Sequence, residues 1–276
     1  MSEVSTAEAS YQGAPGAYSE VAARALLGVG ASLLPRPTLL EMFGAVARGE
    51  AAHAVVPVEN CLTGAVPDAY ELLFAHDLRA VGETRVHVDH VLIAPSGTPT
   101  ERLTRVLSHP VALAQCQRFF ATHPRIEPVP VFDPAGAVEI VIRQSDGRSA
   151  ALASRRSAAI YGGEIIAEHF QDHAENWTRF LLATRDTHEE TAEGPRKALL
   201  TFGLPHTPGA LHHALAPLGQ HRLNLTRIQS QTVHGRPFEY RFIVEMTADS
   251  PEVLSAALDA MREVTQELSL FGNFPL

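Results

Sequence analysis

The sequence predicts an α/β protein in two parts, an alternating helix and strand region followed by a smaller unit of βαββαβ order. Short helical and strand patterns alternate through the first half of the chain, which is typical of a largely parallel sheet covered by helices. Residues 187–195 (THEETAEGP) are charged and contain chain-breaking residues, so we expect a linker there. Beyond the linker the pattern changes to strand, helix, two strands, helix and strand, which is the ferredoxin-like order.

The first recognisable elements lie between residues 38 and 67. Thr38 and Glu41 have the spacing of a capping box ahead of an apolar helix face, so a helix should begin here. The apolar run 54–58 (AVVPV) predicts a buried strand, and the polar residues 59–64 after it predict a turn. Pro67 is then expected in the first turn of the next helix.

The same succession of strand, polar turn and helix recurs downstream. Pro110 in RVLSHPVALAQC is expected near a helix start, and Ser154 in AALASRRSAAIY is expected to cap a helix. Residues 86–94 (VHVDHVLIA) contain β-branched residues without a helical stripe, and could carry the chain into a second α/β lobe. Polar residues therefore gather at the carboxyl ends of strands, which is where ligands bind in open α/β sheets.

The unit after the linker is predicted from segments of contrasting pattern. Two have the spacing of an amphipathic helix and the others that of strands, so two helices should cover one face of an antiparallel sheet. In chain order the segments are 197–204, 208–219, 223–231, 238–246, 251–264 and 267–272.

The composition favours a cytoplasmic protein that binds a small molecule. The chain has 276 residues, 45% of them apolar, which is enough for two or three compact units. Its formal net charge of -9 argues against a nucleic-acid partner, so any positive potential for an anionic ligand must be local. No apolar stretch is long enough to cross a bilayer, and the N-terminal residues lack the features of a secretion signal. Cys61 and Cys116 are expected to be packing thiols rather than a disulfide.

No sequence motif indicates a metal site or a phosphate-binding loop. The chain contains no Walker-type glycine loop, no GxSxG, no paired CxxC and no HExxH. His169 and His173 have the spacing of one helix face, and His206, His212 and His213 are also near one another, but no Cys or carboxylate cluster completes either set. We therefore expect surface histidines and no metal.

Collinear segments spread across nearly the whole chain resemble the prephenate dehydratase family. The run from Asn176 to Phe180 (NWTRF) is similar to the Thr-Arg-Phe strand that is the signature of that family. After Lys197, PGALHHAL and LNLTRI resemble the ACT domain that is joined to it. The other matching segments are 11–20 (YQGAPGAYSE), 56–66 (VPVENCLTGAV), 109–116 (HPVALAQC) and the remainder of 161–183.

The resemblance implies a two-lobed periplasmic-binding-protein type II-like catalytic domain followed by a ferredoxin-like ACT regulatory domain. The catalytic domain would span residues 1–190, with lobe 1 at about 8–86 plus 174–186 and lobe 2 at about 87–173, and the ACT domain would span 196–276. It implies a lyase that converts prephenate to phenylpyruvate, water and CO2 in L-phenylalanine biosynthesis, with no cofactor. L-Phenylalanine would be the effector, and paired ACT domains would give a homodimer or a dimer of dimers.

The resemblance also implies roles for three consecutive residues. Arg179 would bind a substrate carboxylate through its planar, permanently charged guanidinium. Thr178 would donate a hydrogen bond to the departing hydroxyl, although it points to the other face of the strand and would reach the cleft only at a strand end or irregularity. Phe180 completes the catalytic signature. Judged without the resemblance, Arg179 can instead pair with a neighbouring carboxylate, and Thr178 can be an ordinary strand residue.

Further residues are implied as substrate contacts, and each has a plainer alternative. Ser19 is expected to cap the first helix, and both it and Ser154 can be simple caps. Asn60 can merely stabilise a turn, and Gln115 can be solvated. Cys61 stands where the family usually has Ser, so a weaker hydrogen-bonding thiol replaces a hydroxyl. The implied contacts are Gly13, Tyr18, Ser19, Asn60, Cys61, Thr63, Gln115 and Ser154.

The amino-acid site of the ACT domain is implied around its first helix and second strand. Gly209 opens that helix, where backbone N–H groups can receive a carboxylate. The run from Gln229 to Thr232 (QSQT) departs from the Glu-Ser-Arg-Pro of the family, so inhibition, activation and no response to phenylalanine all remain open. The implied residues are Gly209, Ala210, Leu211, Asn224, Leu225 and Ser230.

Other activities on the same scaffold remain open. The substrate could be arogenate, whose side chain bears an amine. The enzyme could decarboxylate prephenate without expelling hydroxide, although the hydroxyl of Thr178 argues against this. The chain could also be a catalytically silent sensor that binds an amino acid and a small anion.

Overall fold

The computed structural model describes residues 6–186, 193–233, 235 and 239–276, which form two compact units. The first unit comprises Met1–His76 and Glu83–Leu182, and the second comprises Asp77–Gly82 and Ala183–Leu276. Most of the predicted linker, residues 187–192, lies outside the described residues.

The first unit contains two α/β lobes. In lobe 1 the strand order is β5-β11-β3-β1-β2, and β1 pairs in parallel with both β2 and β3. The buried AVVPV run lies in the middle of β3, as predicted. The elements of lobe 1 are β1 (Ala7–Gln12), α1 (Tyr18–Leu27), β2 (Leu33–Arg36), α2 (Leu39–Ala47), β3 (Ala51–Asn60), β4 (Gly64–Ala65), α3 (Ala69–Ala75), β5 (Arg79–His87) and β11 (Trp177–Thr184).

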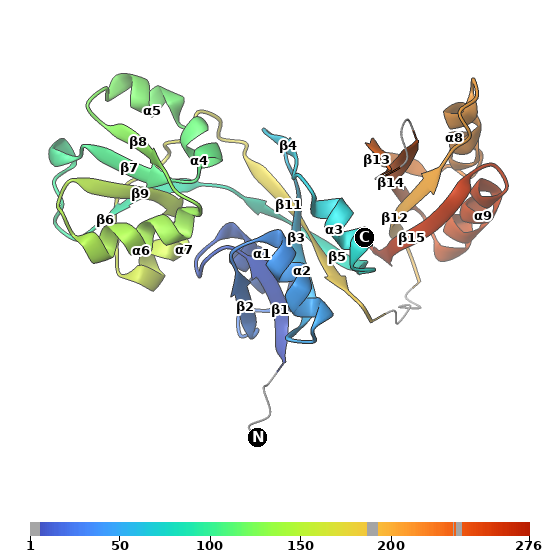
Figure 1. Ribbon diagram of the computed structural model, residues 1–276, viewed down its shortest axis with the longest axis horizontal. Helices are drawn as coiled ribbons and strands as arrows, with labels where there is room; N and C mark the ends of the chain where they lie inside the picture. The colour runs from blue at the N-terminus through green and yellow to red at the C-terminus, as the bar shows by residue number, and fades with distance from the viewer. Residues whose placement is uncertain (1–5, 187–192, 234, 236–238) are drawn as a thin grey trace. The chain divides into compact units, whose positions relative to one another are not determined.

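Lobe 2 is inserted between β5 and β11, which join the two lobes in Figure 1. Its strand order is β10-β6-β9-β7-β8, with β7 parallel to its neighbours and β6 antiparallel to its own. Its elements are β6 (His90–Ala94), η1 (Thr100–Arg102), β7 (Arg105–Ser108), α4 (Pro110–Ala114), α5 (Gln117–Thr122), β8 (Glu127–Pro130), α6 (Pro134–Gln144), β9 (Ser149–Ser154), α7 (Arg155–Tyr161) and β10 (Glu164–Ala167). The crossing near residues 86–94 and the two-lobed fold are thereby confirmed.

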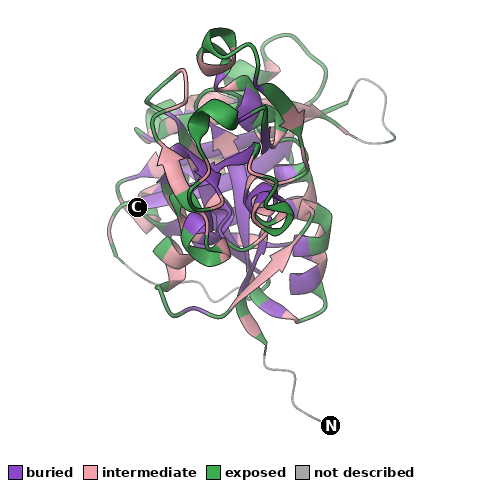
Figure 2. Ribbon diagram, turned by 90° about the vertical axis from the view of Figure 1, so that its left-hand side faces the viewer, coloured by how far each residue is buried: buried purple, intermediate pink, exposed green. Residues whose placement is uncertain are grey.

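The sheet of lobe 2 is buried on both faces. Leu92 belongs to one apolar cluster with residues of α4, and its neighbour Ile93 belongs to a second cluster with residues of α6 and α7. The alternation follows from the two-residue period of a strand. Figure 2 shows buried strand segments within a partly exposed covering of helices and loops.

Local sequence signals fix most helix starts. Thr38 accepts a hydrogen bond from the Glu41 amide, Pro110 is the first residue of α4, and Ser154 caps α7, as predicted. Two predictions were wrong by two residues. The cap of α1 is Ala17 rather than Ser19, and Pro67 precedes α3, which begins at Ala69. The cap position at α1 is occupied without a side-chain hydrogen bond, so the serine rule did not apply there.

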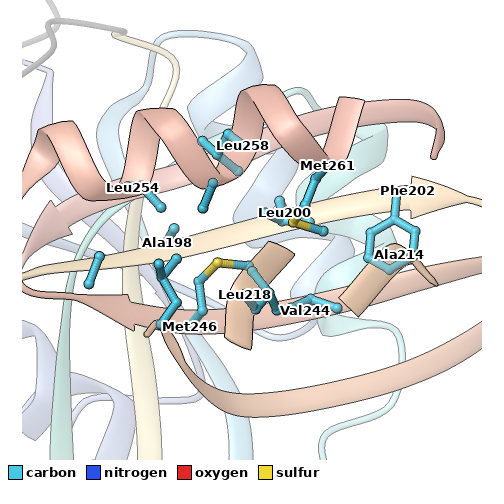
Figure 3. Packing of buried hydrophobic residues seen from close by; sticks show 13 residues of the cluster. Ala198, Leu200, Phe202, Ala214, Leu218, Val244, Met246, Leu254, Leu258 and Met261 are labelled. Atoms are coloured by element: carbon cyan, nitrogen blue, oxygen red, sulfur yellow. The ribbon is translucent and has the colours of Figure 1, made fainter. Parts of the chain in front are cut away.

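The second unit has the predicted βαββαβ order. The sheet runs β13-β14-β12-β15, and each of these neighbouring strands is antiparallel to the next. Figure 3 shows side chains of both helices, among them Leu218 and Leu258, facing Leu200 and Val244 of the strands. The elements are β12 (Arg196–Gly203), α8 (Ala210–Gln220), β13 (Asn224–Thr232), β14 (Tyr240–Ala248), α9 (Pro251–Arg262) and β15 (Gln266–Pro275). Both helices therefore cover one face of an antiparallel sheet.

The two thiols differ. Cys116 is fully buried, as expected of a packing residue, whereas Cys61 is exposed, which contradicts the same expectation. No helix in the described ranges is long and apolar enough to span a membrane. Within those ranges, no group of three or more His, Cys, Asp or Glu side chains is placed to hold a metal ion.

Candidate active site

A cavity of about 630 Å³ in the first unit is lined by residues of both lobes. Its walls include the segment after β1, the turn after β3, the start of β11 and the first turns of lobe 2 helices. It brings together most of the residues implied from the sequence, namely Gly13, Tyr18, Ser19, Asn60, Thr63, Gln115, Ser154, Thr178 and Phe180. Cys61 and Arg179 are not among the residues that line it.

Thr178 and Phe180 face this cavity because they lie two residues apart on β11. Arg179 lies between them and points to the other side. Its guanidinium donates to Glu83 at 3.0 Å, to Glu59 at 3.3 Å and to the Tyr70 hydroxyl at 3.2 Å. Arg179 therefore lies away from the cavity in which we expected it to bind a substrate carboxylate, because strand alternation turns Thr178 toward the cavity and carboxylates of β3 and β5 contact the arginine.

Asn60 holds the Thr178 side chain. Its Oδ1 atom accepts from the Leu62 and Thr63 backbone amides at 3.0 and 3.1 Å, so its Nδ2 must be the donor at the other end. That Nδ2 donates to the Thr178 hydroxyl oxygen at 3.0 Å. An oxygen that accepts from Asn60 keeps its own hydrogen available for another partner.

Cys61 contacts the base of β11 rather than the cavity. Its thiol donates to the Glu175 carbonyl at 3.3 Å and accepts from the Trp177 amide at 3.1 Å, while its own amide donates to the Trp177 carbonyl at 2.9 Å. The thiol thus fastens the turn that carries Asn60 to the strand that carries Thr178. The implied direct substrate contact through Cys61 finds no support in this placement.

The electrostatic character of the cavity differs from the expectation of a guanidinium clamp. No Lys or Arg occurs among the described residues that line it. Burial lowers the pKa of His90 to about 4 and also lowers the pKa of His109, so both imidazoles are neutral at pH 7. An anionic ligand would therefore meet hydroxyl and amide donors and the N-terminal turns of α1 and α6.

Three titratable lining residues were missed from the sequence. Asp133 caps α6, His109 caps α4, and His90 is a buried residue of β6. The Asp-Pro and His-Pro pairs at 133–134 and 109–110 were available signals for helix caps at a ligand-facing strand end. No local signal marks His90, because its position depends on packing between distant segments.

The segment from Gly13 to Glu20 connects the two lobes at the cavity. Ser154 and Ser157 donate to the Gly16 carbonyl at 2.5 and 3.1 Å, and the Ala14 amide donates to Asp133 at 3.1 Å. Gly16 has a φ of 96°, and a Cβ built on it would lie 2.6 Å from the Ser157 hydroxyl and 2.9 Å from the Ser157 Cα. Glycine is therefore required for this approach of the lobes.

Glu20 makes the charged part of the same connection. Its buried carboxylate accepts from the Gly16 amide at 2.6 Å, from Arg24 at 2.8 Å and from Arg156 of lobe 2 at 2.7 Å. Burial opposes ionisation, but the hydrogen bonds from Arg156, Gly16 and Arg24 outweigh it and hold the pKa of Glu20 below its usual value.

Glu20→Gln should reduce the free energy of unfolding at pH 7 by on the order of 2 kcal/mol, because charge-assisted hydrogen bonds are lost. A lowered folded-state pKa stabilises the protein above the unfolded pKa, and that contribution disappears as the pH falls through the folded value. The stability of the wild type should therefore fall more steeply below about pH 4.5 than that of the variant. Urea unfolding at several pH values measures the free energy of unfolding of both proteins. An equally steep fall in both below about pH 4.5 would contradict the prediction.

The residues implied for the amino-acid site are only partly together within the second unit. Gly209 has a φ of 81° and caps α8, and Ala210 and Leu211 line a cavity of about 660 Å³ together with Tyr240 and Arg241. The implied residues Asn224, Leu225 and Ser230 lie on β13 and are not among the lining residues of this cavity.

Comparisons with known proteins show a family and a shared fold. The profile of the prephenate dehydratase family matches residues 9–188. A relative from Arabidopsis thaliana, described as arogenate dehydratase/prephenate dehydratase 2, chloroplastic, is 35% identical over 286 residues, which cover 100% of this chain and 74% of the relative. A prephenate dehydratase from Arthrobacter aurescens, solved in complex with L-Phe, is 26% identical with a TM-score of 0.86, covering 97% of this chain and 90% of that chain. A solved structure described as GqqA, a novel type of quorum quenching acylase, is 33% identical with a TM-score of 0.87, covering 96% of this chain and 97% of that chain.

Proposed function

Because the chain belongs to the prephenate dehydratase family, we propose that it removes water and carbon dioxide from prephenate to give phenylpyruvate. The observation that carries the proposal is the geometry of Thr178. Its hydroxyl oxygen accepts from Asn60, and its side chain lines the cavity, so its hydrogen is available to a ligand. A neutral donor of this kind suits a reaction in which a hydroxyl group must depart.

For this reaction the protein needs only to position the substrate and to stabilise the negative charge that develops on the leaving oxygen. Prephenate carries a ring carboxylate, a pyruvyl side chain and a hydroxyl across the ring, and loss of CO2 and hydroxide makes the ring aromatic. The Thr178 hydroxyl would donate to the leaving oxygen as negative charge develops on it. Because a threonine hydroxyl is a poor acid, we assign it polarisation of the leaving group rather than complete proton transfer.

The two carboxylates would be held by dipoles rather than by an arginine. With Arg179 engaged by Glu59 and Glu83, the donors at the cavity are neutral groups, including the hydroxyl of Thr178, the side-chain amide of Gln115 and the Nε2–H of His109. Oriented N–H groups at helix N-termini stabilise anions where water is excluded. This arrangement binds a dianion without a buried cation.

The test of the proposal is product formation by the purified chain. Prephenate is added at neutral pH, and phenylpyruvate is followed by its ultraviolet absorbance in alkali. Formation of phenylpyruvate well above the spontaneous rate is expected. A ligand that binds without being converted would refute catalysis and favour the silent sensor.

Arogenate is a second candidate substrate, and Asp133 is the observation that favours it. The carboxylate of Asp133 lines the cavity, where Oδ2 accepts from the Ala14 and Gly136 amides at 3.1 and 2.8 Å. Arogenate bears an ammonium group where prephenate bears a ketone, and a carboxylate in a cavity without Lys or Arg among its described lining residues would attract that group.

Asp133→Asn separates the two substrates. Asparagine is also a good helix cap, so α6 should be retained while the charge is lost. If arogenate is used, the ratio of kcat/KM for arogenate to that for prephenate should fall about tenfold or more, which is the loss of one charge-assisted hydrogen bond. Steady-state kinetics with both substrates measures the ratio. Equal changes for both substrates would remove Asp133 from substrate selection.

The hydroxyl groups of the same cavity can be compared with what an acylase would need. Acyl transfer from an amide needs a nucleophile activated by an adjacent base. The Ser154 hydroxyl instead donates to the Gly16 carbonyl, and Thr178 is held by the amide of Asn60. These contacts support the dehydratase proposal over an acylase.

For the second unit we infer binding of L-phenylalanine. The helix start at Gly209 and the nearby Arg241 can receive the carboxylate of an amino acid. The relative from Arthrobacter aurescens, of the same fold throughout, is described as a complex with L-Phe. Kinetics with and without L-phenylalanine test the inference, and identical curves would refute an effector role.

A further inference from the structure

A continuous set of hydrogen bonds runs beneath the cavity from the turn after β3 into lobe 2. Asn60 Nδ2 donates to Asn176 Oδ1 at 2.7 Å, and Asn176 Nδ2 donates to Gln115 Oε1 at 3.0 Å. The same Gln115 oxygen lies 3.3 Å from His90 Nε2, and His90 Nδ1 lies 3.2 Å from the Tyr18 hydroxyl. Asn176 is fully buried, so it cannot exchange these partners for water.

The direction of every bond in this set follows from backbone groups at one end. The Leu62 and Thr63 amides can only donate, so Asn60 must present Oδ1 to them and Nδ2 to Asn176. Asn176 must then present Oδ1 to Asn60 and Nδ2 to Gln115. Gln115 consequently accepts through Oε1 and turns its NH2 group away from Asn176. The oxygen and the nitrogen of each amide are thereby distinguished by their hydrogen-bond partners.

His90 extends this set of hydrogen bonds within lobe 2. Because Gln115 presents Oε1 to His90, the neutral imidazole must carry its hydrogen on Nε2. Nδ1 is then the unprotonated nitrogen, 3.2 Å from the Tyr18 hydroxyl, which donates to the Asp89 carbonyl at 2.7 Å. The oxygen of Gln115 therefore receives two donors.

We propose that Asn176 and His90 are positioning residues that hold the Gln115 amide with its N–H groups toward the cavity. For its kinetic consequence this rests on the proposed function. In a cavity whose described lining contains no Lys or Arg, an N–H group of Gln115 attracts an anionic substrate and a flipped carbonyl repels it. Gln115 would act on binding of the anion, whereas Thr178 is placed by Asn60 and acts on the leaving group.

Asn176→Asp tests the proposal through the pH dependence of KM. When protonated, the introduced carboxyl can still donate to Gln115, and when ionised it can only accept and forces the amide to flip. Burial raises the pKa of a carboxyl, so this change should fall near neutral pH. KM for prephenate should be within about threefold of wild type at pH 6 and rise on the order of tenfold by pH 9, with kcat nearly constant.

The pH dependence of KM in the wild type serves as the reference for the other titratable groups near residue 176. Burial lowers the pKa of His90 to about 4 and raises the pKa of Tyr18 well above its usual value, so neither changes charge between pH 6 and 9. The remaining neighbours on adjoining segments are Cys61, His87, Asp89, Asp172 and Glu175. They are present in both proteins, so only a difference between the two profiles counts.

A double-mutant cycle separates the flipped amide from simple repulsion by the new charge. In a Gln115→Met background the introduced carboxyl has no amide to turn. The pH-dependent rise in KM should then vanish, and an equal rise in both backgrounds, or none in either, would overturn the proposal.

Hydrogen exchange of side-chain amides in the ligand-free wild type gives a readout that does not need turnover. Resonances are assigned by their loss in Gln115→Glu and Asn176→Asp. The Gln115 NH2 group should exchange quickly with water of the cavity, and the Asn176 group should be strongly protected. Comparable protection of both groups would overturn the orientation. If the wild type does not convert prephenate, the proposed function fails while this measurement still decides the orientation.

Discussion

Thr178→Val should lower kcat for prephenate by about 10²- to 10³-fold and leave KM within a few-fold of wild type. Valine keeps the branched shape that fits β11 but removes the hydroxyl. The Asn60 donor retains Asn176 Oδ1 and the Trp177 carbonyl as acceptors, so the turn should stay in place. Because the lost interaction strengthens as the leaving oxygen gains charge, the effect belongs to the chemical step. Steady-state kinetics separates the two constants.

Thr178→Ser is the matched control for this prediction. Serine supplies the same hydroxyl to Asn60 and should retain most of the activity. An increase in KM with unchanged kcat in Thr178→Val would place the hydroxyl in ground-state binding and would refute its role at the leaving group.

Arg179→Met should destabilise the first unit by about 3 kcal/mol while the protein that remains folded binds substrate normally. Arg179 is 9% exposed and lies 3.0 Å from Glu83 and 3.3 Å from Glu59, and methionine has a similar length without the charge. Removing the cation leaves two carboxylates of β3 and β5 near each other without their shared partner. Glu59 is partly exposed, which places the expected cost at the lower end for buried pairs.

Urea unfolding with KM measured on the same preparations tests the second prediction. Arg179→Lys serves as its control, because it keeps the charge but cannot reach both carboxylates and the Tyr70 hydroxyl with one planar group. It should fall between the wild type and Arg179→Met in stability. A large rise in KM without loss of stability would return Arg179 to the substrate site.

The orientations of Thr178 and Arg179 could be predicted from the sequence only in part. The alternation of a strand predicted that only one of the two would face the cleft, and charge favoured the arginine. What decided the outcome is the placement of Glu59 and Glu83 on strands that meet β11 only in the folded protein. No local pattern near residue 179 contains that information.

The sequence was sufficient to predict features that depend on interactions between residues close together in the chain. The caps at Thr38 and Ser154 depend on a side chain and an amide three residues away, and both were predictable. The order of the second unit followed from the periodicity of its segments. Asn176 and His90 could not be found in this way, because each gains its significance from partners in distant segments.

The two lobes approach each other closely at Gly16 and Ser157. A single added methyl at residue 16 would meet both the side chain and the main chain of Ser157, and would act as a wedge between the two halves. Water admitted by that gap would compete for the donors that the anion needs and would weaken them through its high dielectric constant. The tight fit between the lobes thus depends on the absence of a side chain at residue 16.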